Sequence, residues 1–324
     1  FFMETSYRCF AMTAKPITIY TCKLQSGQAD KLQDVLEKQG FESREVPYAA
    51  FAGKKDKLNV VFYTSGKLVI QGKGTQEFVQ FVLEPDILGE VKLGYENVLD
   101  PSRLDPRIGI DESGKGDYFG ALCIAGVYIN KDMVEPWEQA GLMDSKRVSS
   151  DKRIAALADV IRRTKGCIYS VVPIGPEAYN RLNTKMKSVN TMLAWGHARV
   201  IENLMQRKDL MQPPPVRAIS DQFARSKSTI SNALMASGRE IELVQRHKAE
   251  SDLAVAAASI LARDAFVQGI DQLSQRFHME IPKGASQRVI DVGKCLVEAH
   301  GKSILNETSK IHFKTTRKIM GEDV

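Results

Sequence analysis

Hydrophobic and polar positions change their period several times in the first quarter of the chain. Ile17–Leu24 alternates and is rich in β-branched residues, which predicts a strand, and Asp30–Lys38 has apolar residues at helical spacing. Two strand-like runs, Leu58–Tyr63 and Lys67–Gly72, are joined by a Thr-Ser-Gly turn, which is a hairpin signal. Gln76–Leu83 resumes a helical period. The pattern predicts a small α+β module whose sheet contains the hairpin.

From residue 107 onward, strand-like and helix-like patterns alternate. Apolar runs predict strands at Arg107–Ile110, Ala121–Ile129, Gly166–Ile174, Val216–Ile219 and Ile241–Gln245. Helical spacing predicts a charged helix between the second and third of these strands, and long helices at Val189–Lys208 and Leu253–Phe277. Strands that alternate with long helices are typical of an α/β domain.

The stretch between these two regions predicts a connection. Residues 84–106 mix Pro, Gly, Asp and Asn without a sustained period. We predict a first domain at 15–88, a linker at 89–106 and a second domain at 107–324, as expected for a chain of 324 residues. Residues 1–14 lack the basic start and apolar stretch of a signal peptide, so we expect an extension or a disordered segment there.

Cysteine usage and hydropathy exclude several classes of protein. The five cysteines are scattered without a C-x-x-C pair, which argues against a disulfide framework and a zinc site and fits a cytoplasmic protein. Apolar runs fall short of the roughly 20 residues that a membrane-spanning helix needs, so we expect no membrane association.

The net charge of +6 is distributed in a way that suits a long polyanion. Five lysines stand against one acid between Ala52 and Thr75. Eight Lys or Arg residues stand against three acids between Lys283 and Lys318. Two basic segments far apart in the chain favour a nucleic acid over a small anion as the partner.

Four carboxylates stand just after predicted strands. Asp111 and Glu112 follow the strand at Arg107–Ile110, and Asp221 follows the short strand at Val216–Ile219. Glu250 stands between the strand at Ile241–Gln245 and the last long helix. Each alone is typical of a solvated turn, a helix cap or a helix start. Together, converging carboxylates repel unless a cation neutralises them, and oxygen ligands without His or Cys suit Mg²⁺. We therefore interpret the four acids as a candidate site for two ions that promote cleavage of a phosphodiester.

Glycines follow the first acidic pair. Gly114 and Gly116, on either side of Lys115, allow backbone amides to approach a sugar–phosphate closely. A G-x-G sequence alone occurs in many turns. Beside the carboxylates it gains meaning, because a nuclease can recognise RNA by the 2′-hydroxyl.

Residues Gly109–Gly120 (G-I-D-E-S-G-K-G-D-Y-F-G) closely resemble the signature of type 2 ribonucleases H in the HIII form. The HII form normally has Arg at the position of Lys115, and Ala121 replaces a Pro that is usual in the family, with little effect expected at a strand start. Further blocks resemble the same family in the same order: Asp144–Lys146, Asn190–Asn203, Ala254–Arg263, Ile281–Gly284 and His312–Thr316.

The resemblance implies an α/β protein with an RNase H-like catalytic domain, a mixed central sheet flanked by helices. It implies metal-binding and catalytic acids at Asp111, Glu112, Asp221 and Glu250, holding two Mg²⁺ ions or Mn²⁺ in their place. Asp252 and Asp264 compete with Glu250 for the fourth position. Asp252 fits a helix cap better, and Asp264 is expected to face solvent or a basic neighbour.

The resemblance also implies a substrate and the residues that bind it. We expect cleavage of the RNA strand of RNA–DNA hybrids, giving 5′-phosphate and 3′-hydroxyl ends, by a monomer without an organic cofactor. Gly114, Lys115 and Gly116 are expected to read the 2′-hydroxyls, and Ser145 and Lys146 to hold a phosphate.

Residues 17–88 resemble the N-terminal module of the HIII enzymes, which is similar to the TATA-binding protein and which the HII enzymes lack. The likeness is carried by Tyr63–Gly74. The family implies that this small α+β domain binds the hybrid, with Tyr63, Lys67 and Lys73 as expected contacts.

Three other functions remain open at this stage. An HII-like enzyme would incise at single embedded ribonucleotides, a binding protein without activity would leave RNA intact, and a DNA-directed nuclease or integrase could share the fold. The N-terminal module and Lys115 favour the HIII form over the first, and the motif around Gly114 disfavours the last.

Overall fold

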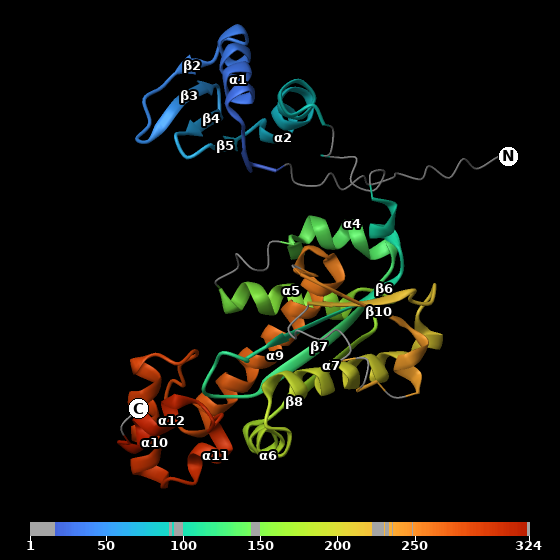
Figure 1. The fold of residues 1–324 in the computed structure, drawn as a ribbon, viewed down its shortest axis with the longest axis vertical. Helices are drawn as coiled ribbons and strands as arrows, with labels where there is room; N and C mark the ends of the chain where they lie inside the picture. The colour runs from blue at the N-terminus through green and yellow to red at the C-terminus, as the bar shows by residue number, and fades with distance from the viewer. Residues whose placement is uncertain are drawn as a thin grey trace, which may run out of the picture. The chain divides into compact units, whose positions relative to one another are not determined.

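The computed structural model describes residues 17–90, 93, 100–143, 150–221, 230, 233–234, 236–247 and 249–322, and Figure 1 shows its ribbon. Contacts within the chain divide it into two compact units, Phe1–Ser102 and Arg103–Val324. We refer to them as unit 1 and unit 2. The domain limits proposed above at 15–88, 89–106 and 107–324 stay a prediction.

Unit 1 contains a five-stranded antiparallel sheet in the order β1-β5-β4-β3-β2. Its strands are β1 (Ile19–Lys23), β2 (Glu42–Ser43), β3 (Ala49–Lys55), β4 (Leu58–Tyr63) and β5 (Lys67–Gly72). Its helices are α1 (Ser26–Lys38), α2 (Thr75–Phe78) and the π-helix η1 (Val79–Leu88). Val60, Leu68 and Ile70 of the sheet share a buried core with Leu32 of α1 and Leu83 of η1.

The predicted hairpin of unit 1 is confirmed: β4 and β5 have the predicted limits, and Gly66 in their turn has a φ of 79°. Helix α1 begins four residues earlier than predicted, and the side chain of Gln28 accepts a hydrogen bond from the backbone N–H of Gln25 just before it. The last helical segment was expected to end at Leu83, but η1 continues to Leu88 past an internal proline.

The two faces of the sheet in unit 1 carry different side chains. Phe62 and Leu68 lie opposite each other in the register and pack into the core. Because side chains alternate along a strand, Tyr63 and Lys67 point to the other side of the sheet. Thr21 shares that side, which we call the outer face. Two of the predicted substrate contacts therefore lie on one surface.

Unit 2 contains a mixed five-stranded sheet in the order β10-β9-β6-β7-β8. Its strands are β6 (Arg107–Ser113), β7 (Leu122–Ile129), β8 (Tyr169–Ile174), β9 (Arg217–Asp221) and β10 (Glu242–Arg246). Strands β6, β9 and β10 are parallel, whereas β7 is antiparallel to both of its neighbours. This is the mixed central sheet that the sequence predicted.

The α-helices described in unit 2 surround this sheet and extend beyond it at the C-terminal end of the chain (Figure 1). They are α4 (Lys131–Ala140), α5 (Asp151–Arg163), α6 (Pro176–Met186), α7 (Val189–Met205), α9 (Leu253–Arg276), α10 (Gln287–His300), α11 (Ile304–Thr308) and α12 (Lys314–Met320). One charged helix was predicted between β7 and β8, and the structure has both α4 and α5 there. Helices α6, α10, α11 and α12 were not predicted.

Helices α9 and α7 cover opposite faces of the sheet at two glycines. A Cβ atom on Gly109 of β6 would lie 2.1 Å from the carbonyl carbon of Ala254 in α9. A Cβ atom on Gly126 of β7 would lie 2.3 Å from a side-chain carbon of Val200 in α7. Gly126 pairs with Ile110, which neighbours Gly109 on β6, so the two glycines point to opposite faces.

Helix α9 is the central helix of unit 2. By length and hydropathy alone it could cross a membrane, and 67% of its most apolar 18-residue window is buried inside the fold. That burial is what the core helix of a folded domain requires.

Candidate active site

Asp111 and Asp221 lie on neighbouring strands. The parallel register of β6 and β9 pairs Arg107 with Arg217 and Ile110 with Ser220, and each acid is the next residue on its strand. Adjacent strands are about 4.8 Å apart, and residues at the same level of a parallel pair point to the same face. The fold therefore brings these two predicted metal ligands side by side on the face that α9 covers.

Glu112 points to the opposite face. The sequence prediction ended the strand at Ile110 and placed the acidic pair in a turn, but β6 continues to Ser113. Asp111 and Glu112 are thus paired with β7 and alternate in direction. Asp111 is hydrogen bonded to Ser259 of α9, whereas Glu112 Oε2 lies 3.1 Å from Nε2 of His197 in α7.

The electrostatics of the two acids differ accordingly. Burial, together with the negative charge of Glu112, raises the pKa of Asp111 to about 6. Burial also acts to raise the pKa of Glu112, but the hydrogen bond and charge of His197 and the charge of Lys115 outweigh it, so that pKa is lowered. Lys115 Nζ lies 3.6 Å from Glu112 Oε1. The Glu112 side chain is thus held as an ionised carboxylate, whereas a nearby cation would stabilise the ionised form of Asp111.

The carboxylate oxygens of Asp111 and Asp221 on the α9 face suit a hard divalent cation. Oδ1 of Asp221 is buried without a hydrogen-bond partner, and such an oxygen is costly unless it gains a donor or a cation. Across the part of the chain that the structure describes, no group of three or more His, Cys, Asp and Glu side chains is close enough to hold a metal ion. The convergence of all four acids on shared ions therefore stays a prediction.

Glu250 is placed by a short loop between β10 and α9. Strand β10 ends at Arg246, directly opposite Asp221 in the parallel register. Glu250 follows in the 3-10 helix η6 (Ala249–Ser251). Ala249 shares a buried cluster with Ile219 of β9, so η6 packs against the strand that carries Asp221.

The two competitors of Glu250 have other partners. Asp252 is the N-cap of α9, and its side chain accepts from the backbone N–H of Ala254 at 2.9 Å, as the sequence predicted. Asp264 is buried and pairs with Arg162 at 2.6 Å, so its expected basic neighbour is confirmed. Neither carboxylate is available to a metal without breaking these contacts.

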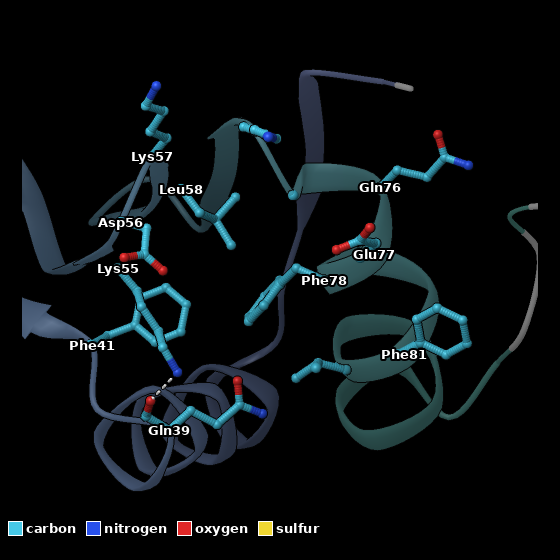
Figure 2. Close-up of a pocket in the computed structure, with 13 residues that line it drawn as sticks. Gln39, Phe41, Lys55, Asp56, Lys57, Leu58, Gln76, Glu77, Phe78 and Phe81 are labelled. Atoms are coloured by element: carbon cyan, nitrogen blue, oxygen red, sulfur yellow. Dashed lines mark hydrogen bonds between the residues drawn. The ribbon is translucent and has the colours of Figure 1, made fainter. Parts of the chain in front are cut away.

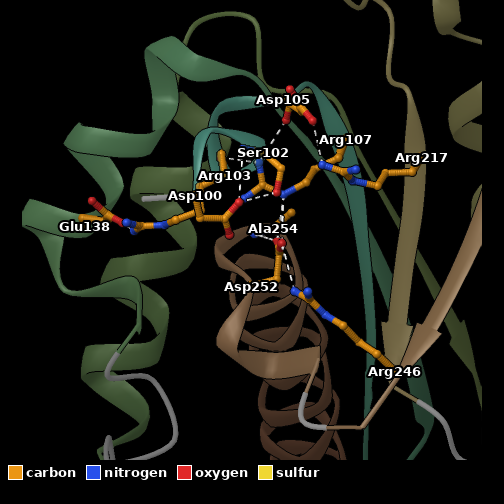
Figure 3. A network of polar contacts seen from close by, with 10 residues as sticks. All are labelled: Asp100, Ser102, Arg103, Asp105, Arg107, Glu138, Arg217, Arg246, Asp252 and Ala254. Carbon is orange, nitrogen blue, oxygen red and sulfur yellow. Dashed lines mark hydrogen bonds and ion pairs between the residues drawn. The ribbon is translucent and has the colours of Figure 1, made fainter. Parts of the chain in front are cut away.

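A network of arginines and carboxylates fixes both ends of the loop that carries Glu250 (Figure 3). Nε of the buried Arg107 donates to both Asp252 oxygens, at 2.9 and 3.0 Å. Arg246 reaches the same carboxylate at 3.3 Å. Arg107 also donates to the backbone carbonyl of Asp105, whose carboxylate pairs with Arg217 at 2.7 Å. The network ties the start of α9 to β6, β9 and β10.

The glycine turn after β6 contains two different kinds of glycine. Gly114 is buried and has a φ of 87°, and a Cβ atom there would lie 2.3 Å from the carbonyl oxygen of Ala121. Gly116 is exposed, and a Cβ atom there would meet no atom within 4 Å. The fold requires glycine at the first position only. The open space at Gly116 suits the close approach of a ligand to its backbone.

The remaining predicted substrate contacts are divided among different places. Tyr63 and Lys67 lie on the outer face of unit 1, whereas Lys73 follows β5 and lines a pocket of about 680 Å³ on the same unit. Figure 2 shows Phe41, Phe78 and the exposed Phe81 around this pocket. Ser145 and Lys146 lie outside the described residues.

Comparison with known proteins places both units in one family. The model of the Ribonuclease HII family matches residues 108–316, and a domain family of unknown function, DUF3378, matches residues 19–88. Ribonuclease HIII of Chlamydia felis is 42% identical over 303 residues, which are 93% of this chain and 97% of that protein. The chain belongs to the ribonuclease HIII family.

Other members of the ribonuclease HIII family agree in sequence and in fold. Ribonuclease HIII of Protochlamydia amoebophila is 42% identical over 96% of this chain and 99% of its own length. The crystal structure of Bst-RNase HIII in complex with Mn²⁺ has a TM-score of 0.64 at 27% identity, covering 94% of this chain and 98% of that one. The RNase H-like fold expected for unit 2 is thereby confirmed.

Sequence reasoning missed His197 and Ser259, the neighbours of the first two acids. Both lie in blocks that resemble the family. A single polar residue in an apolar helix is usually a structural residue of the core, so the sequence offered no reason to assign either one to the site. Only the packing of α7 and α9 on opposite faces of β6 reveals that they contact Glu112 and Asp111.

Proposed function

We propose that this chain is an endoribonuclease that hydrolyses the RNA strand of RNA–DNA hybrids and leaves 5′-phosphate and 3′-hydroxyl ends. The observation that carries the proposal is the placement of Asp111 and Asp221 side by side on β6 and β9, next to a glycine turn that is open at Gly116. Relatives that are 42% identical over most of the chain and are named Ribonuclease HIII support it.

Asp111, Asp221 and Glu250 would hold two Mg²⁺ ions, with Mn²⁺ as a substitute, and Glu112 would act beside them from the other face of β6. When bound, such ions stabilise negative charge on the phosphodiester and favour ionisation of the attacking water. The raised pKa of Asp111 and the unpartnered oxygen of Asp221 support this role, because both favour a nearby cation. His197 holds the Glu112 carboxylate in one orientation on the other face of β6.

The glycine turn supplies the selectivity for ribose. We assign recognition of the 2′-hydroxyls to the backbone of Gly114, Lys115 and Gly116, since peptide N–H and C=O groups can bond a hydroxyl that DNA lacks. Ser145 and Lys146 would hold a neighbouring phosphate, where a lysine binds as a point charge.

The outer face of unit 1 would bind the hybrid. Tyr63 offers an aromatic ring and Lys67 an exposed ammonium on the same side of the sheet. Lys73 would act from the edge of the neighbouring pocket. Phosphate contacts of this kind make binding strongly dependent on salt.

We further propose that the protein acts as a cytoplasmic monomer, away from membranes and without an organic cofactor. The free thiols of Cys22, Cys123, Cys167 and Cys295 support a reducing compartment.

A second candidate function is incision at single embedded ribonucleotides, which would correspond to the HII form. It is favoured by the match of unit 2 to the Ribonuclease HII family model. The presence of unit 1 and of Lys115 in the glycine turn favours the first proposal.

A panel of labelled duplexes tests both candidates. The full chain is incubated with a uniform RNA–DNA hybrid, a DNA duplex with one ribonucleotide, an RNA duplex and a DNA duplex, each with Mg²⁺, Mn²⁺ or EDTA. We expect cleavage of the hybrid only, and none in EDTA. Preferred cleavage at the single ribonucleotide would establish the second candidate, and intact RNA in every reaction would refute both.

A further inference from the structure

Lys310 is a fully buried lysine whose ammonium donates hydrogen bonds to backbone carbonyls and lies over the ring of Tyr179. Its side chain is 0% exposed. Its Nζ atom lies 2.8 Å from the carbonyl oxygen of Asp117, 2.7 Å from that of Gly120 and 3.4 Å from that of Phe119. An ammonium group has three protons, so this one turn can use its whole donor capacity. A buried lysine is costly and is retained where its charge has a task.

The three carbonyls belong to the return half of the glycine turn. This turn leaves β6 at Ser113 and enters β7 at Leu122. The backbone N–H of Asp117 lies 3.3 Å from the carbonyl oxygen of Gly114. This hydrogen bond links the return half of the turn to Gly114, and Gly116 directly precedes Asp117 in the chain.

The backbone around Lys310 holds the same turn. Its N–H donates to the carbonyl of Tyr118 at 2.8 Å, and Gly120 donates to the carbonyl of Thr308 at 2.9 Å. The hydroxyl groups of Tyr118 and Thr316 are 3.0 Å apart. The segment that ends α11 and leads into α12 thus encloses residues 117–120, with the Lys310 ammonium at its centre.

Two further hydrogen-bonding residues fix the turn and the segment that carries Lys310. The backbone N–H of Gly284 donates to Oδ1 of Asp117 at 2.6 Å. Asn180 of α6 donates to the carbonyl of Ser309 at 2.9 Å and accepts from the N–H of Ile311 at 3.1 Å. The residues on either side of Lys310 are therefore anchored to α6, and the ammonium has a fixed position from which to hold the turn.

We propose that Lys310 is a positioning residue for cleavage: its ammonium fixes the carbonyls of Asp117, Phe119 and Gly120 and thereby the backbone that contacts the ribose. The role rests on the proposed function, in which Gly114–Gly116 recognise the 2′-hydroxyls. An apolar side chain of similar length would fill the space but leave the buried carbonyls without donors, so the turn would relax.

The test compares Lys310→Met with the wild type and with Lys131→Met, which changes an exposed lysine at the start of α4. Hydrogen–deuterium exchange of peptides covering residues 113–121 reports on the turn. Cleavage is followed on a uniform hybrid and on a hybrid with a single 2′-deoxynucleotide beside the cut. The ratio of the two rates measures recognition of that hydroxyl.

For Lys310→Met we expect faster exchange of the turn, a kcat/KM about 10- to 100-fold lower on the uniform hybrid, and a rate ratio closer to one. Lys131→Met should match the wild type in all three. If Lys310→Met does not fold, Lys310→Gln, which retains N–H donors, should fold and show the same changes to a smaller degree.

A folded variant with unchanged exchange and an unchanged rate ratio would overturn the proposal, even if its overall rate fell, because a purely structural residue would lower both rates equally. A wild-type ratio of one would instead refute ribose recognition by this turn. In that case the hydrogen–deuterium exchange measurement alone decides whether Lys310 fixes the turn.

Discussion

The imidazole Nε2 atom of His197 lies 3.1 Å from Oε2 of Glu112, and the histidine is buried. The contact joins α7 to β6 and keeps Glu112 on the face opposite Asp111. The histidine helps to lower the pKa of Glu112, so that this carboxylate is ionised. A buried partner that orients a carboxylate next to a metal site affects both metal affinity and activity.

Replacing His197 with Ala should therefore reduce cleavage of the hybrid about 10- to 100-fold and raise the Mg²⁺ concentration needed for half-maximal rate. Initial rates across a Mg²⁺ titration give both quantities. His197→Gln, whose amide can still donate to Glu112, should lose less. An unchanged Mg²⁺ dependence in a folded Ala variant would contradict the role of this contact.

Gly114 and Gly116 of the turn should respond differently to the same substitution. Gly116→Ala meets no protein atom, so the midpoint of thermal unfolding should not change, whereas hybrid cleavage should fall about tenfold because a methyl group stands where the ribose approaches. Gly114→Ala should destabilise the fold by about 1–3 kcal/mol, since its backbone conformation and surroundings exclude a Cβ atom. Full activity of Gly116→Ala would argue against substrate contact at this backbone.

The ion pairs around Asp252 allow a matched comparison of stability. Asp252→Ala removes the cap of α9 and leaves Arg107 buried without its carboxylate, so the free energy of unfolding should fall by about 3–5 kcal/mol. Arg246→Met breaks a more exposed pair with the same aspartate and should cost less than about 1 kcal/mol. Urea unfolding measures both. Equal losses in the two variants would show that the network does not anchor the start of α9.

Hybrid binding by the outer face of unit 1 is tested by salt dependence. Lys67→Ala should weaken binding and reduce the slope of log K against log salt by about 0.7–0.9, the loss expected for one phosphate contact. Lys38→Ala, which changes an exposed lysine at the end of α1, serves as the control. Fluorescence anisotropy of a labelled hybrid at several salt concentrations gives the slopes. Equal slopes for wild type and Lys67→Ala would place the hybrid elsewhere.

Elements with a strong local signal could be predicted from the sequence. The β4–β5 hairpin was predicted at its observed limits, because two apolar runs flank a turn that contains Gly66. Strand β3 was missed because Ala and Gly occupy positions where strand signals need branched or aromatic side chains. Strand β6 was ended too early, because Asp111 and Glu112 break its apolar run while the pairing with β7 continues through them.

Only those residues of the candidate site that lie in recognisable sequence motifs could be predicted. The sequence indicated Asp111, Glu112, Asp221 and Glu250, and the fold places the first and third of them on adjacent strands. It did not indicate that Glu112 faces α7, since that direction depends on where β6 ends. Lys310 was counted only as part of a basic segment, because its burial depends on a turn about 190 residues away in the sequence.

The central claim is that Asp111 and Asp221 bind the same divalent cations and that those cations are required for cleavage. The most direct measurement is isothermal titration of Mn²⁺ into wild type, Asp111→Asn and Asp221→Asn, combined with hybrid cleavage and hybrid binding by the same proteins. We expect both variants to lose Mn²⁺ binding and cleavage while they bind the hybrid nearly as well as the wild type. Normal turnover or unchanged Mn²⁺ binding by either variant would contradict the account.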